Sequence, residues 1–130
     1  MKRIAVLVAI SLLLLASPAW AITFTVSGSI VEGQYTEPTT NANGSALTDL
    51  AKTNVYYQIP GQSAVKGPNV PASALTGGGT ITTSVTVPLV AGQEADVTFW
   101  VTASDTSGNE SARSPETVER IDRLSPNPPQ

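Results

Sequence analysis

The chain has 130 residues, with 7 Lys and Arg against 10 Asp and Glu, and a formal net charge of −3 at pH 7. It contains no cysteine and no histidine, which excludes disulfides, thiolate metal sites and imidazole acid–base chemistry. An acidic chain also lacks the positive surface that nucleic acid and anionic lipid require, so we expect neither as a partner.

Residues 1–21 have the order of a secretory signal peptide. "MKR" is basic, "IAVLVAISLLLLA" is a continuous apolar run, and "SPAWA" ends in small residues at Ala19 and Ala21. The apolar run is about thirteen residues long, shorter than the roughly 17–25 needed to span a bilayer. We therefore expect cleavage after Ala21 and a secreted or periplasmic protein. The remaining chain would carry five basic and ten acidic residues, a net charge near −5.

After residue 21, short runs that alternate apolar and polar residues lie between turn residues. Several such runs with turn signals between them are typical of an all-β sandwich or barrel. In chain order, the clearest predicted strands span residues 22–26, 29–38, 53–59, 80–88, 94–104 and 114–121.

Two loops separate these predicted strands. Residues 39–51 form a long polar loop in which Leu47 and Leu50 are the only large apolar side chains. We expect both leucines to plug the end of the core. Residues 60–79 are crowded with Pro and Gly, which leaves room for one short edge strand around residues 63–66.

The strand at residues 94–104 is predicted to be half-buried, with Val97, Phe99 and Val101 on its core face. The polar stretch "SDTSGNES" that follows it predicts a hairpin turn. Asp105 can accept hydrogen bonds from the backbone of the turn, and Gly108 can adopt a positive φ without steric cost.

Three stretches together resemble a fibronectin type III domain of the kind found in secreted bacterial proteins. They are "PTTNANGSALTDLAKTNVYY" (38–57), "VTFWVTASDTSGNES" (97–111) and the proline-rich "RLSPNPPQ" at the end. The resemblance implies an immunoglobulin-like β-sandwich of about seven antiparallel strands over residues 22–124. It also implies that the third and sixth strands are neighbours in one sheet. Residues 125–130 would form a Pro-rich, linker-like tail.

The chain departs from the family at three core positions. Tyr35 stands where the family usually has a core Trp, and Gly33 stands where a large apolar side chain is usual. Val97 matches a place that normally holds an inward Tyr. We therefore expect a lighter core than is typical. No Arg-Gly-Asp triplet is present, so the cell-adhesion role of some animal members is not implied.

The strongest candidate for a binding surface is an aromatic pair. If Val55 and Phe99 face the core on neighbouring strands, Tyr56 and Trp100 both face outward and lie close together. Such groups are common at interaction surfaces, although cross-strand aromatic pairs also stabilise sheets. The second set of binding candidates is the loop residues Asn41, Asn43 and Asp49.

The turn after residue 104 also offers oxygen ligands for calcium. Asp105, Asn109 and Glu110 are the weak candidates, but a hairpin turn explains the same residues without a metal. "NGS" (43–45) and "NES" (109–111) match the glycosylation acceptor pattern, and we interpret both as turn sequences.

A catalytic function is not expected, because no His or Cys is present to act as base, ligand or nucleophile. Glu94 and Asp96 point the same way at the start of a strand, which is typical of a solvated strand end that discourages edge pairing. No cofactor is expected either.

The leading hypothesis is therefore an exported, non-catalytic module that binds an unidentified protein or carbohydrate, or acts as a spacer. One alternative is a structural subunit of a surface or envelope assembly that uses exposed strand edges or the tail. The other is an accessory module separated from a larger secreted polysaccharide-degrading enzyme. Residues alone do not choose among them, because fold does not determine function.

Overall fold

The structure, a computed structural model, describes residues 22–130, so the predicted signal peptide at residues 1–21 lies outside the described part of the chain. These residues form seven antiparallel strands and no helix, hence none that is long and apolar enough to cross a membrane. The strands are β1 (Thr23–Ser27), β2 (Ile30–Thr36), β3 (Leu50–Gln58), β4 (Val65–Pro71), β5 (Thr80–Thr86), β6 (Glu94–Asp105) and β7 (Thr117–Asp122).

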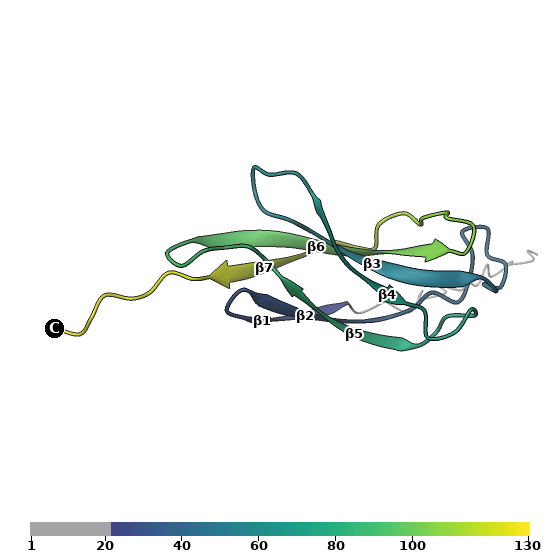
Figure 1. Ribbon diagram of the computed structural model, residues 1–130, viewed down its shortest axis with the longest axis horizontal. Coiled ribbons are helices and arrows are strands. Elements are labelled where there is room, and N and C mark those ends of the chain that lie inside the picture. The colour runs from purple at the N-terminus through teal and green to yellow at the C-terminus, as the bar shows by residue number, and fades with distance from the viewer. Residues whose placement is uncertain (1–21) are drawn as a thin grey trace, which may run out of the picture.

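The strands form two sheets that face each other (Figure 1). One sheet has the order β1-β2-β5 and the other has the order β4-β3-β6-β7. A single hydrophobic cluster with members from both sheets lies between them. The predictions of an all-β fold, of seven antiparallel strands and of adjacent third and sixth strands are confirmed.

Several strand boundaries differ from those predicted. Strand β3 starts at Leu50, inside the predicted loop, because Leu50 already pairs with Asp105 of β6. Strand β4 spans Val65–Pro71, longer than the predicted edge strand, and its two prolines are tolerated because β4 has a neighbour on one side only. Strand β7 starts only at Thr117.

The alternating patterns predicted the core faces correctly. Val31, Tyr35, Val55, Val97 and Phe99 are all buried in the core cluster. Leu47 and Leu50 are buried as well, as expected for plugs at the end of the core.

Gly33 faces the core, and an aromatic ring fills the space beside it. A Cβ added at Gly33 would lie 2.7 Å from Cε1 of Phe24. The Phe24 ring in turn packs on Phe99, with 4.8 Å between ring centroids. The missing side chain at position 33 is therefore compensated by Phe24 from the neighbouring strand β1.

The prediction that β6 is half-buried is wrong for its second half. Trp100, Thr102 and Ser104, on the outer face of β6, are also buried. The segment of residues 110–114 returns along this part of β6 instead of diverging from it. Because of this return, the second half of β6 is covered on both faces.

The returning segment is fixed by two serines. The backbone N–H of Ser111 donates to the carbonyl of Ala103, and the Ser111 hydroxyl accepts from the Ala103 N–H (2.8 and 2.9 Å). Ser114 makes the same two bonds with Val101 (2.9 Å each). The N–H groups of β6 here donate to serine hydroxyls instead of to the backbone carbonyls of a neighbouring strand. Regular pairing with β7 therefore begins only at Thr117.

The turn between β6 and this segment has the predicted chemistry. The Asp105 carboxylate accepts from the backbone N–H groups of Ser107 and Asn109 at 3.0 and 2.9 Å. Gly108 has a φ of 87°, which a residue with a side chain rarely adopts.

Gly33→Ala should lower the free energy of unfolding by about 1–3 kcal/mol, because the added methyl overpacks the Phe24 ring. A glycine-to-alanine change in an unstrained strand would instead stabilise by about 0.5–1 kcal/mol. Urea denaturation of the purified protein measures the difference. Gln34→Ala, at the exposed neighbouring position, is the control. A more stable Gly33→Ala variant would contradict the close approach of Phe24.

Candidate functional site

Tyr56 and Trp100 are directly opposite each other on β3 and β6. Their rings are stacked, with 5.6 Å between centroids and 6° between planes. The stack continues on both sides. The guanidinium carbon of Arg113 lies 4.1 Å from the centre of the Trp100 ring, and Nζ of Lys66 lies 5.8 Å from the centre of the Tyr56 ring.

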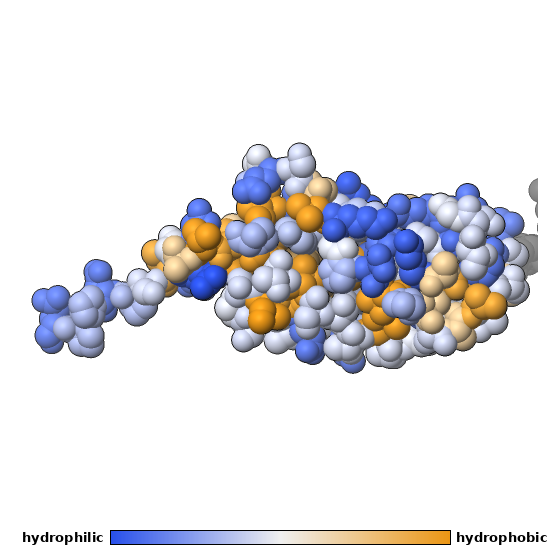
Figure 2. Space-filling view, in the orientation of Figure 1, coloured by the Kyte–Doolittle hydropathy of each residue, from blue (hydrophilic) through white to orange (hydrophobic). Residues whose placement is uncertain are grey.

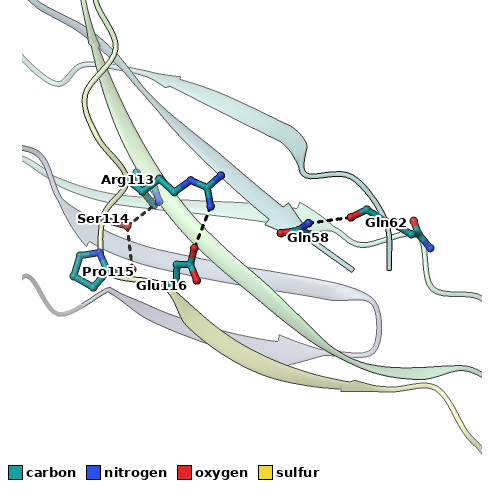
Figure 3. A network of polar contacts seen from close by, with 7 residues as sticks. Gln58, Gln62, Arg113, Ser114, Pro115 and Glu116 are labelled. Carbon is teal, nitrogen blue, oxygen red and sulfur yellow. Dashed lines mark hydrogen bonds and ion pairs between the residues drawn. The ribbon is translucent and has the colours of Figure 1, made fainter. Parts of the chain in front are cut away.

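The four side chains form a row across the outer face of the sheet, which we call the aromatic–cation row (Lys66, Tyr56, Trp100, Arg113). Arg113 comes from the returning segment, where Glu116 pairs with its guanidinium at 3.1 Å (Figure 3). Trp100 is only 2% exposed as a result. An anchor for a partner needs accessible ring surface, and within the row Tyr56 retains more of it than Trp100 does.

Glu110, in the turn after β6, connects the aromatic–cation row to that turn through hydrogen bonds. Its Oε1 accepts hydrogen bonds from the Tyr56 hydroxyl and the Thr102 hydroxyl, both at 2.6 Å. These bonds favour the charged carboxylate, so the Thr102 and Tyr56 hydroxyls hold the pKa of Glu110 below its usual range. The same bond to Glu110 raises the pKa of Tyr56.

The loop after β2 and the turn after β6 meet at one end of the sandwich, which brings the candidate Asn41 close to the turn candidates (Figure 1). A pocket of about 230 Å³ lies between the loop of residues 38–49 and the turn of residues 105–111. We call it the loop-end pocket. Leu47 and Leu50 form its apolar floor, and Asn41, Asn109 and Glu110 contribute to its polar rim.

The free polar groups of this pocket are mainly acceptors. The Asn41 side-chain nitrogen donates to the Ser45 hydroxyl and the Ala46 carbonyl, and that of Asn109 donates to Asp105 at 2.9 Å. Their side-chain carbonyl oxygens have no such bond within residues 22–130. The pocket therefore suits a ligand that donates hydrogen bonds.

The other two loop candidates have mainly local roles. The Asn43 side-chain oxygen accepts from the backbone N–H and the hydroxyl of Ser45, at 3.0 and 2.6 Å. The backbone carbonyl of Asp49 accepts from the Thr106 N–H at 2.9 Å and so joins the loop to the turn. Neither side chain lines the loop-end pocket.

The carboxylates do not gather into a metal site within residues 22–130. The Asp105 carboxylate is engaged by the turn, which holds its pKa below the ordinary value through the bonds from Asn109. Glu94 and Asp96 both pair with Arg120 of β7, at 2.9 and 3.3 Å. The two carboxylates lie on the same face because they are two residues apart on β6, and Arg120, opposite Asp96 on β7, pairs with both of them.

Two buried polar residues escaped the sequence analysis. Glu37 is fully buried, and its carboxylate accepts from the backbone N–H groups of Ser73 and Gly79. The alternation of β2 does place Glu37 on the inward side after Val31 and Tyr35, so its position was predictable and its partners were not. Asn54 is also buried and donates to the hydroxyls of Thr102 and Ser104, which adds a polar layer beneath Glu110.

Comparison with protein-family models, with curated proteins and with solved structures finds no match for this chain.

Trp100→Ala should lower the free energy of unfolding by about 3–5 kcal/mol, because it removes a large buried ring between two neighbours. Arg113→Ala should cost about 0.5–1 kcal/mol, the value of a partly exposed cation–π contact. Thr98→Ala, on the same face of β6, is the control. Urea denaturation checks all three, and a loss below about 1 kcal/mol for Trp100→Ala would mean that Trp100 is not a packed residue.

Stability should fall in acid partly through Glu110. Its pKa is lowered on folding, so its contribution is present above the unfolded value of about 4.3 and is lost as the pH falls through the folded pKa. Asp105 acts in the same direction. Urea midpoints measured between about pH 7 and pH 3 should fall less steeply in Glu110→Gln than in the unchanged protein. Equal slopes would contradict a lowered pKa at Glu110.

Proposed function

We propose that residues 22–124 are an exported, non-catalytic module similar to fibronectin type III domains, which binds a protein or carbohydrate partner at the loop-end pocket. The observation that carries the proposal is the convergence of two separate loops on a pocket with an apolar floor and a polar rim. Ligand sites commonly combine these features.

The order of the strands supports the domain assignment. Strands β3 and β6 are neighbours, as the resemblance implies. Strand β4 pairs with β3, whereas the fourth strand of a constant-type immunoglobulin domain joins the opposite sheet. The two loops that line the pocket follow the second and the sixth strands. In variable immunoglobulin domains the corresponding loops belong to the antigen-binding end.

The chemistry of the rim indicates what kind of ligand fits. The side-chain carbonyls of Asn41 and Asn109 and the carboxylate of Glu110 accept hydrogen bonds. A sugar supplies hydroxyl donors, and a peptide supplies amide or ammonium donors, whereas an anionic ligand would meet an acidic rim. Pro38 and Ala42, which line the pocket and are more exposed than the buried Leu47 and Leu50, can contact the apolar face of either kind of ligand. The donor requirement favours neutral glycans and peptides over acidic ones.

The positions of the pocket and the C-terminal tail are compatible with a spacer role. The C-terminal tail leaves from the end opposite the pocket (Figures 1 and 2). Figure 2 also shows exposed apolar side chains in small groups between polar ones. A spacer held by its tail would present the loop-end pocket outward.

Ala42→Arg should abolish partner binding, because Ala42 is an exposed residue of the pocket lining and the long cationic side chain would fill the space. The immobilised protein is exposed to envelope and culture-medium fractions and to an array of neutral glycans and peptides. Retained ligands are then compared with those of the variant. Gln34→Arg, an equal change on the outer face of β2, is the control and should bind normally.

Ligand retention by two variants distinguishes a binding site in the loop-end pocket from one on the aromatic pair. A ligand that Ala42→Arg still retains and Tyr56→Ala loses would place the site on the aromatic–cation row. If the unchanged protein retains no ligand, the binding function fails and the spacer role remains.

A further inference from the structure

Strand β5 lies at one edge of the β1-β2-β5 sheet (Figure 1). The hydrogen bonds between β2 and β5 show which backbone groups of β5 point away from the sheet. Val87 donates to the Ser29 carbonyl and Glu37 donates to the Gly79 carbonyl. In the register of β2 with β5, these bonds direct the odd-numbered residues of β5 toward β2. The backbone groups of the even-numbered residues therefore point away from the sheet: Thr80, Thr82, Ser84 and Thr86.

Nothing within residues 22–130 pairs with this row. Strand β4 approaches β5 near Gly67, but there it meets the inward side chain of Val85. The side chains of the four even-numbered residues are all exposed.

The edge also lacks the features by which proteins usually block edge pairing. No charged residue occurs between Lys66 and Glu94, and β5 contains neither Pro nor Gly. Charges, prolines and bulges are the common protections of exposed edges.

The other edges differ from β5. Strand β4 carries Pro68, Pro71 and a register shift beside Gly67. Strand β7 carries Glu119, Arg120 and Asp122. Strand β1 has only five residues. Among the four edges, β5 is both long and unprotected.

We propose that β5 pairs antiparallel with β5 of a second copy of this chain, joining two β1-β2-β5 sheets into one continuous sheet. A two-fold axis at Thr83 places Thr82 opposite Ser84 of the other copy and Thr80 opposite Thr86. Every residue in these pairs has its backbone groups directed outward, so both edges satisfy each other along their whole length. The contact is isologous and closes at a dimer.

Charge favours contact between two copies at the β5 edge over contact through their other faces. The described chain has an excess of acidic residues, so most faces of two copies repel each other. Along β5 no charges meet, and the facing side chains are Thr and Ser, which pair well across strands. The dimer does not use the loop-end pocket, so the test of the dimer is independent of the test of the proposed function.

Analytical ultracentrifugation of the purified protein tests the dimer. We expect reversible, concentration-dependent dimers, and Thr82→Lys should weaken the association by about tenfold or more. Gln34→Lys is the matched control, since Gln34 is opposite Thr82 on the same face of the central strand β2. It should leave the dimer unchanged, as should Ala42→Arg. A protein that stays monomeric up to about 1 mM would overturn the proposal.

Engineered cysteines test the register, because the chain has none of its own. In the proposed pairing, position 82 of one copy faces position 84 of the other. A mixture of Thr82→Cys and Ser84→Cys proteins should therefore form disulfide-linked dimers faster than either variant alone. Equal rates in the mixture and in the separate variants would overturn the pairing at β5 even if dimers are present.

Discussion

Strand β6 is the element on which the rest of the structure depends, because it is paired on both edges and its second half is covered on both faces. Its inner face supplies Val97 and Phe99 to the core, and its edges bind β3 and β7. Its outer face holds Trp100 under the guanidinium of Arg113. For a chain with no disulfide, this one strand concentrates much of the burial that folding requires. A strand buried on both faces needs partners for every polar side chain that it carries.

The outer face of β6 meets that requirement with a chain of hydrogen bonds. Asn54 donates to Thr102, Thr102 donates to Glu110, and Glu110 also accepts from Tyr56. The last of these residues stacks on Trp100. The polar and aromatic contacts therefore hold the same return segment in place from two directions. Since that segment begins at the loop-end pocket, the order of the rim depends on the packing beneath it.

The alternation of apolar and polar residues correctly predicted the features that depend on local sequence patterns. The inward sets of residues, the plugs Leu47 and Leu50 and the turn at Asp105 follow from patterns of a few neighbouring residues. The path of residues 110–114 does not, because it is fixed by the hydroxyls of Ser111 and Ser114, which accept hydrogen bonds from backbone N–H groups of β6 in place of the carbonyls of a regular strand. The cover over Trp100 arises from this non-periodic path. The pairing of Tyr56 with Trp100 was predicted from alternation together with the adjacency of the third and sixth strands that the resemblance implied, but the burial of Trp100 was not.

The placement of charge separates the two surfaces that the molecule leaves open. The loop-end pocket has carboxylates on its rim, so a second acidic copy of the chain is a poor occupant and a neutral donor is a good one. The β5 edge has no charge and offers backbone groups in both directions, so its best complement is an identical edge. In these two proposals, the pocket would select a ligand by side-chain chemistry, and the β5 edge would select a partner by backbone register. The pocket lies at the end of the sandwich where β5 begins. Because the two β5 strands of the proposed dimer run antiparallel, the two pockets would lie at opposite ends, so the dimer could bridge two separate partners but could not bind one surface through both sites.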